Sequence, residues 1–266
     1  MMAPPEPKNG KIPVALYTFG GIILTLAFSA IAFVLSVILE PFTLIRVILL
    51  TFCAIGAYYI LQDASFILLG VILKAEANPF VRNRDPKATK TYYNAMKIME
   101  GIALGISLRD MPEAWFQIPN DADLKTTESL MVCGFSCDRL MDERRYDEAY
   151  ALYSHYDSIG SEMTVASRVE FICGRAEAKM LTGNYSEAAE IMRQLLNYRQ
   201  MKGFTMTSTV LSTDYMAALL LENDPAKAEN IMRQFEKREI NCPYCMRFNL
   251  DRELMQTAWN RYYGKQ

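Results

Sequence analysis

Few residues of this 266-residue chain have the types and spacing to do chemistry. Its one histidine, His155, excludes a His-Glu-x-x-His zinc motif within this sequence, and we expect it to be a surface or partly packed residue. No glycine-rich phosphate loop is present, and Gly20-Gly21 lies in an apolar run where small residues serve close helix packing. Cys242 and Cys245 form the sharpest short motif, because two thiolates at this spacing suit disulfide exchange or half of a tetrahedral zinc site.

The segment Cys242-Pro243-Tyr244-Cys245 is similar to the redox centre of glutaredoxins, which implies thiol redox activity. Such a centre requires a strand–helix–strand context, whereas the surrounding sequence has helical periodicity. A second Cys-x-x-Cys for zinc is missing, and Cys133 with Cys137 makes an incomplete site. Incidental small residues in a loop are therefore the alternative to a redox pair.

Two apolar runs indicate a membrane protein. Ile12–Leu39 contains no charged side chain, and Val47–Gln62 follows it after a break at Glu40-Pro41. About 20 apolar residues span the hydrocarbon core, so we expect membrane helices over about 12–39 and 42–62. The next apolar run, 64–73, would cover roughly 15 Å as a helix and either extends the second helix or lies in the membrane interface.

Basic residues flank the outer ends of this pair of runs. Lys8 and Lys11 precede the first run, Lys74 and later cations follow the second, and only Arg46 lies between them. The positive-inside bias therefore predicts a multi-pass protein of the cell membrane, with both termini and the remaining chain in the cytoplasm. Asp63, at the end of the second run, is explained by an interfacial position without any function.

The charge of the whole chain is balanced. It holds 28 Lys and Arg against 30 Asp and Glu, and the basic residues form no clustered run. Nucleic-acid binding normally requires a basic face, so we predict no nucleic-acid partner. From Asp85 onward the apolar pattern is helical, which predicts an all-α domain.

Internal similarity is the next strong signal. One pair of similar segments is offset by forty residues, and another pair is offset by thirty-nine. Each marks a tight turn followed by a helix whose first buried position is a small alanine, as in a helical hairpin. The segments are Ala188 with Ile191–Gln194 against Ala228 with Ile231–Gln234, and Arg145–Ala149 against Asn184–Ala188.

These units resemble tetratricopeptide repeats, most closely in Ala178–Ala189, although their period exceeds the usual 34 residues. The alternative is a generic bundle of helical hairpins. The resemblance implies a groove that binds a protein or peptide partner. Exposed residues of the first helix in each unit would face this groove, around Asp138, Arg175 and Asp214.

Four segments resemble bacterial membrane proteins related to the site-2-protease class of zinc metallopeptidases: Met2–Glu6, Gly10–Tyr17, Leu108–Phe116 and Arg139–Glu143. In that family, two histidines of His-Glu-x-x-His and a later Asp hold zinc, and the Glu activates the zinc-bound water.

This sequence lacks the histidine motif, and Asp85 is only a weak remnant of the later ligand. We therefore expect a non-catalytic, membrane-anchored interaction module that needs no cofactor. The alternative is a portion of an intramembrane zinc metallopeptidase whose histidine-bearing helix lies upstream or on a partner. The predicted organisation is a membrane anchor over 1–74, a helical linker region over 75–122 and a tetratricopeptide-like helical repeat domain over 123–266.

Overall fold

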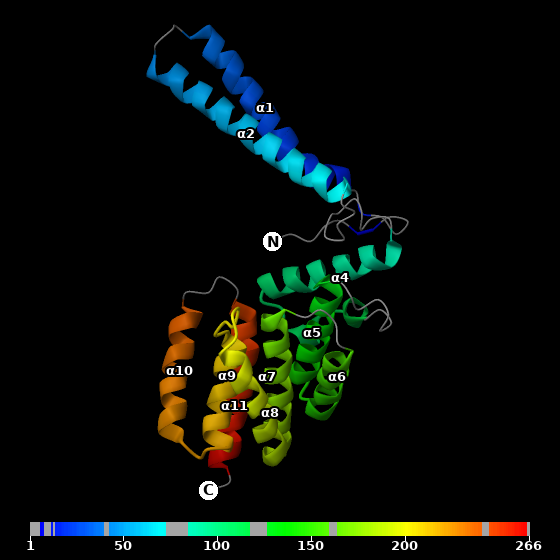
Figure 1. Ribbon diagram of the computed structural model, residues 1–266, viewed down its shortest axis with the longest axis vertical. Helices are drawn as coiled ribbons and strands as arrows, with labels where there is room; N and C mark the ends of the chain where they lie inside the picture. Colours follow the sequence, from blue (N-terminus) through cyan, green and yellow to red (C-terminus); the bar gives the residue numbers. More distant parts are fainter. Residues whose placement is uncertain are drawn as a thin grey trace. The chain divides into compact units, whose positions relative to one another are not determined.

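The computed structural model describes residues 6–7, 12, 14–39, 43–72, 85–117, 127–159, 164–240 and 245–264. In these ranges the regular structure consists of ten α-helices and two short 3-10 helices, and no strand occurs (Figure 1). The prediction of an all-α protein is confirmed. The chain divides into two compact units, one over Pro4–Tyr93 and the other over Asn94–Gln266.

The first unit contains two long apolar helices that lie side by side, α1 (Val14–Ile38) and α2 (Leu44–Ile72) (Figure 1). Within them, Phe19–Ile38 and Leu44–Leu69 are long and apolar enough to cross a membrane. Many of their large apolar side chains are exposed, which suits a hydrocarbon environment and would be costly in water.

Helix α2 extends beyond the end of the second membrane helix that the sequence predicted. The predicted second membrane helix and the apolar run after Asp63 form one continuous helix of 29 residues. At 1.5 Å per residue it measures about 43 Å, whereas the hydrocarbon core is about 30 Å thick. The run after Asp63 therefore extends the second helix, which is one of the two alternatives that the sequence left open.

Small residues form the contact between α1 and α2. Cys53 Sγ donates a hydrogen bond to the carbonyl oxygen of Ser29 at 3.2 Å, and a Cβ added at Gly56 would overlap Ser29 Oγ. By contrast, no atom of the described residues lies within 4 Å of a Cβ at Gly20 or Gly21, so the close contact among the described residues lies at Gly56. Close approach at small residues is the usual way that membrane helices associate.

Helix α4 (Pro86–Ala103) begins with proline, whose missing N–H costs no hydrogen bond in the first turn. Asp85 stands before it, and its Oδ1 accepts a hydrogen bond from the Lys87 backbone N–H at 2.9 Å. Two 3-10 helices follow, η1 (Leu108–Asp110) and η2 (Glu113–Phe116).

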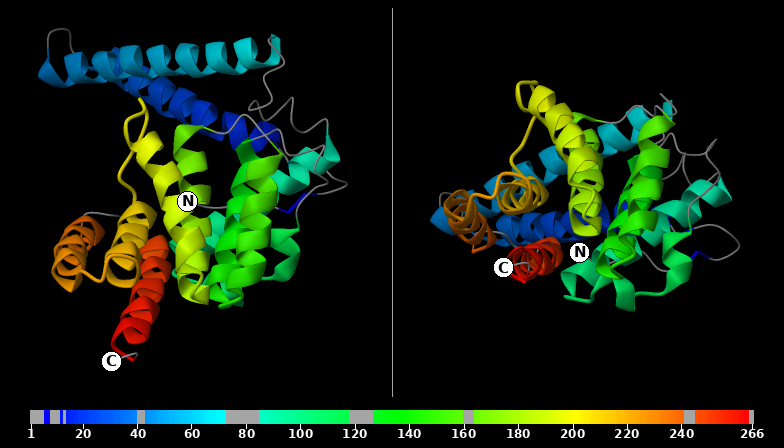
Figure 2. Two further views of the ribbon diagram at one scale, coloured as in Figure 1. Left: turned by 60° about the horizontal axis from the view of Figure 1, so that its bottom comes forward. Right: turned by 90° about the horizontal axis from the view of Figure 1, so that it is seen from below.

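The second unit continues as three helical hairpins and a final helix, which follow one another in chain order (Figure 1 and Figure 2). The first helices of successive hairpins contact each other, and the final helix packs against the first helix of the third hairpin. The elements are α5 (Thr127–Asp142) with α6 (Tyr146–Ser158), α7 (Val165–Thr182) with α8 (Tyr185–Arg199), α9 (Ser208–Leu220) with α10 (Pro225–Glu239), and α11 (Cys245–Tyr263).

Each hairpin turn contains one residue in the left-handed backbone region. These residues are Arg144 with φ 61°, Gly183 with φ 87° and Asn223 with φ 54°. A left-handed residue after a helix lets the chain reverse direction while the last carbonyls of the helix still accept hydrogen bonds. The three turns thus share one local solution although only one of them uses glycine.

The recurring alanines occupy equivalent buried sites in the second helix of each hairpin. Ala149, Ala188 and Ala228 are all 0% exposed, as their positions in the repeated segments predicted. Close approach also marks α7, because a Cβ added at Gly174 would overlap the ring of Tyr153 on α6. Small residues therefore set how near the helices of this unit can come.

Candidate functional site

The first helices of the hairpins and α11 enclose a pocket of about 380 Å³. Its walls are largely apolar, with the rings of Phe135 on α5 and Phe171 on α7 among them. The remaining lining residues are Leu130, Met131, Gly134, Asp138, Tyr153, Thr164, Ser167, Glu170, Thr207, Ser208, Thr209 and Arg247.

Helix starts bring several polar residues to this pocket. Thr164 and Thr207 precede α7 and α9, and each side-chain oxygen accepts a backbone N–H of the first turn, from Ser167 at 3.2 Å and from Val210 at 3.3 Å. Such capping fixes where a helix begins. Because Arg247 also lies in the first turn of α11, one end of the pocket gathers the starts of three helices.

Arg247 is the cation of the pocket. Its Nη1 lies 2.6 Å from Asp138 Oδ1, and its Nε donates a hydrogen bond to Thr209 Oγ1 at 3.0 Å. Burial lowers the pKa of Arg247, but the charges of Asp138 and Asp251 outweigh that effect and raise it well above its usual range. Tyr153 donates its hydroxyl proton to Asp138 at 2.6 Å, and burial followed by the Asp138 charge raises the pKa of this phenol. The guanidinium therefore stays charged and the phenol stays protonated.

Two fully buried carboxyl groups lie behind this pair. Glu177 on α7 and Asp251 on α11 are each 0% exposed. Thr213 Oγ1 donates a hydrogen bond to Glu177 Oε1 at 2.9 Å, and Arg247 Nε lies 3.0 Å from Asp251 Oδ1 as an ionic neighbour without the alignment of a hydrogen bond.

Three carboxyl oxygens of these two residues accept no hydrogen bond from the described residues: Glu177 Oε2, Asp251 Oδ1 and Asp251 Oδ2. Burial is the main cause that raises the pKa of Glu177 to about 8, and the neighbouring Asp251 charge adds to it. Burial also raises the pKa of Asp251 to about 7, against the opposing effect of Arg247. The hydroxyl group of Ser212 lowers the pKa of Glu177 and that of Ser208 lowers the pKa of Asp251, each by less than burial raises it.

The three residues predicted to line one groove do not share one pocket. Asp138 lines the pocket just described, Asp214 lines a separate hollow between α8, α9 and α10, and Arg175 lines neither. Arg175 Nη1 instead lies 2.5 Å from Asp157 Oδ2 on α6, and Asp214 pairs with Arg199 on α8.

Their side chains are also not openly exposed, contrary to the expectation, because each is engaged by a neighbouring helix. The exposed fractions are 18% for Asp138, 12% for Arg175 and 17% for Asp214.

Of the other candidate residues, two lie at structural or surface positions, and the side chains of two are not described by the structure. Asp85 caps α4, and His155 is exposed on α6 beside the Tyr156 ring. Cys242 lies outside the described residues, and so does the side chain of Cys245, whose backbone begins α11. Within the described part of the chain, no group of three or more His, Cys, Asp or Glu side chains has the arrangement to hold a metal ion.

The buried cysteines offer no reactive thiolate. Cys133, Cys137 and Cys173 are free thiols with 0% exposure. Burial is the main cause that raises the pKa of Cys137 and of Cys173 well above its usual range, so both stay protonated at neutral pH. Protonated thiols are poor nucleophiles and poor metal ligands.

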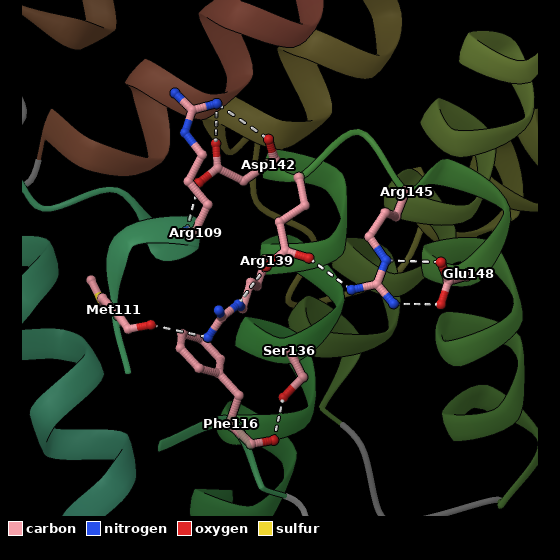
Figure 3. Close-up of polar contacts among 9 residues, drawn as sticks. Arg109, Met111, Phe116, Ser136, Arg139, Asp142, Arg145 and Glu148 are labelled. Carbon is pink, nitrogen blue, oxygen red and sulfur yellow. Dashed lines mark hydrogen bonds and ion pairs between the residues drawn. The ribbon is translucent and has the colours of Figure 1, made fainter. Parts of the chain in front are cut away.

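Two segments that carried the site-2-protease resemblance contact each other. Arg139 on α5 donates from Nη1 to the carbonyl oxygen of Met111 at 3.1 Å and lies over the Phe116 ring (Figure 3). Ser136 Oγ is 3.1 Å from the Phe116 carbonyl oxygen, to which it donates. These contacts fasten the 3-10 segment to α5, so a structural role accounts for both segments.

The residues that sequence reasoning missed are Glu170, Glu177, Arg247 and Asp251. One signal was available, because Glu177 stands between two alanines of a helix whose neighbouring positions are apolar. The other was the hydroxyl-rich run Thr207–Thr213, which caps α9 and forms its first turns.

Comparisons of this chain with known protein families, with curated proteins and with solved structures found no match. Its function is therefore inferred from the chemistry of the pocket and the two apolar helices.

Proposed function

We propose that this chain is a membrane-anchored, non-catalytic interaction module whose pocket binds an extended segment of a partner protein. The observation that carries the proposal is the pocket of about 380 Å³ shared by α5, α7, α9 and α11. Pockets of this size that join apolar walls to a few fixed polar groups are the usual form of a binding site. No cofactor enters the proposal.

The three hairpins support a relationship to tetratricopeptide repeats. Each has a short turn with one left-handed residue and a fully buried alanine in its second helix. In such arrays, neighbouring units bury a continuous core, and the first helices of the units form one face.

The basic flanks of α1 and α2 support a cytoplasmic location for the pocket. Lys8 and Lys11 precede α1, and Lys74 follows α2, whereas the one basic residue near the turn between the two helices is Arg46, in the first turn of α2. We infer a two-helix anchor in the cell membrane with both chain ends in the cytoplasm. The partner segment would then come from a cytoplasmic protein or from the cytoplasmic part of a membrane protein.

The charge of the pocket favours a partner segment with a basic side chain. Asp138 is neutralised by Arg247, so Glu170, which forms no ion pair with the described residues, leaves the lining with one net negative charge. The rings of Phe135 and Phe171 in the pocket lining suit an apolar side chain, and an aromatic ring also attracts a cation. We therefore propose a segment in which Lys or Arg stands next to a large apolar residue.

Binding of the full chain in nanodiscs to a peptide array tests this function. The array holds random extended peptides, and the bound set should be enriched in Lys or Arg beside Leu or Phe. Gly134→Phe should lower binding at least tenfold, because a Cβ at Gly134 meets only Phe171 at 3.8 Å and a ring there fills the pocket. Glu170→Lys should remove the preference for basic residues.

Ala151→Phe is the matched control, since it adds the same ring to an exposed position of α6. It should leave the bound set unchanged. An unselective array, or a selection that Gly134→Phe leaves intact, would show that the pocket is not the binding site.

A further inference from the structure

The interface where α11 meets α7 and α9 holds more acid than base. Around Arg247 lie four carboxyl groups: Glu170 and Glu177 from α7, Asp138 from α5 and Asp251 from α11 itself. Among the described residues, α6 adds the phenol of Tyr153, α7 adds the thiol of Cys173 beside Glu177, and α9 adds hydroxyl groups. The buried hydroxyl residues of α9 are Ser208, Thr209, Ser212 and Thr213.

One arginine does not neutralise this set. Its Nη1 lies beside Asp138 and its Nε hydrogen bonds to Thr209, so the polar neighbours of Asp251 are the unaligned Arg247 Nε and the hydroxyl of Ser208. Glu177 has one hydroxyl donor for two oxygens. An ionised carboxylate that is buried without donors is strongly destabilised, whereas a protonated carboxyl tolerates the same surroundings.

We propose that Glu177 and Asp251 form a proton-dependent latch that holds α11 against α7 and α9. With both carboxyl groups protonated, the helix stays docked. When a proton leaves, an uncompensated charge remains at the interface, and the helix loosens so that water can reach it.

The direction of the pH effect follows from the two carboxyl groups. Their pKa values in the docked state, about 8 for Glu177 and about 7 for Asp251, lie above those of the same groups in water. The docked state thus holds protons that the loosened state releases. Docking is strongest at acidic pH and weakens as the pH rises toward 8.

The latch also acts on the pocket, because Arg247 lies one turn before Asp251 on α11 and lines the pocket wall. Loosening α11 withdraws this wall and frees Asp138. This consequence for partner binding rests on the proposed function, whereas the latch itself does not.

Hydrogen exchange of the full chain in nanodiscs tests the latch. Backbone protection is followed at pH 6 and pH 9, corrected for intrinsic exchange rates, with α8 as the internal reference. Protection of α11 should fall at least about tenfold relative to α8, since a single proton released on opening already changes the opening constant by about tenfold per pH unit.

Glu177→Gln keeps the side-chain volume but cannot ionise. The loss of α11 protection between pH 6 and pH 9 should therefore be at least about tenfold smaller in this variant than in the wild type. Glu236→Gln, on the exposed side of α10, is the matched control and should behave as the wild type. Constant protection of α11 in the wild type would overturn the latch, as would an unchanged fall in Glu177→Gln. If the variant does not fold, the wild-type titration alone decides.

Peptide binding measured at the same two pH values separates the two proposals. A protein that shows the α11 transition but binds no array peptide at either pH keeps the latch and loses the proposed function. A protein that binds peptides with no α11 transition loses the latch alone.

Discussion

Arg109 binds Asp142 through both its backbone and its side chain. The Arg109 backbone N–H donates to Asp142 Oδ2 at 2.9 Å, and its Nη1 lies 3.4 Å from Asp142 Oδ1 (Figure 3). Residues 33 positions apart are thereby joined, and the segment before the hairpins is fixed to the end of α5. Asp142 is 6% exposed, so its carboxylate is a buried acceptor for a backbone donor.

Removing this acceptor should destabilise the second unit. Asp142→Ala leaves the Arg109 N–H without its partner, which costs about 1–3 kcal/mol. For a domain of this size that corresponds to roughly 2–10 °C in Tm, measured by circular dichroism of the full chain in nanodiscs. Asp142→Asn retains an acceptor oxygen and should lose less. The control Asp110→Ala removes an exposed carboxylate from the same segment and should change Tm little. Equal losses in the two alanine variants would contradict this role.

Two glycine-to-alanine changes should have opposite signs. Gly174→Ala places a methyl group inside the Tyr153 ring, and relieving that overlap costs about 1–3 kcal/mol. Gly134→Ala meets only Phe171 at 3.8 Å, so the better helix propensity of alanine should stabilise by up to about 1 kcal/mol. Thermal unfolding of both variants beside the wild type measures the difference. Stabilisation by Gly174→Ala would show that α6 and α7 are less closely packed than described.

The α1–α2 contact should depend on Gly56 and not on Gly20. Ser29→Cys places a thiol next to Cys53, and oxidation in membranes should form an intrachain disulfide that mass spectrometry detects. Gly56→Leu should lower the disulfide yield at least about fivefold, because its side chain overlaps position 29. Gly20→Leu makes the same change at a position where none of the described residues lies within 4 Å, and it should leave the yield intact. A yield that falls equally in both variants would place the contact elsewhere.

Global stability should fall from acidic to alkaline pH. The raised pKa of Glu177, about 8, means that the folded state binds a proton that the unfolded state has already lost above about pH 4.5. Its stabilising contribution is complete below that pH and is lost as the pH rises to about 8, at about 1.4 kcal/mol per pH unit. Thermal unfolding of the wild type and Glu177→Gln from pH 5 to 8 should show the variant with the shallower decline. Parallel declines would mean that Glu177 does not bind this proton.

Periodicity and repeated segments predicted much of the fold, because they report local burial. The alanines at 149, 188 and 228 revealed the hairpins, since a small buried residue recurs wherever two helices approach closely. The continuity of α2 through Asp63 was left open, because one polar residue in an apolar run ends neither a helix nor a span by itself.

The pocket was harder to predict because its residues come from helices far apart in the sequence. Asp138 was identified, but its partner Arg247 lies beyond five intervening helices and follows no local pattern. Arg175 and Asp214 were assigned to the same face by repeat position. In the structure, rotation of each helix about its axis turns them toward α6 and α8 instead.

The place of α11 in the chain has a consequence for biosynthesis. Glu177 and the hydroxyl residues of α9 leave the ribosome before Arg247 and Asp251, which complete their surroundings. Until α11 has been synthesised, Glu177 faces water, where its carboxyl group ionises normally. Docking of α11 then requires Glu177 to take up a proton again, so the last step in maturation of this domain should be faster in mildly acidic surroundings.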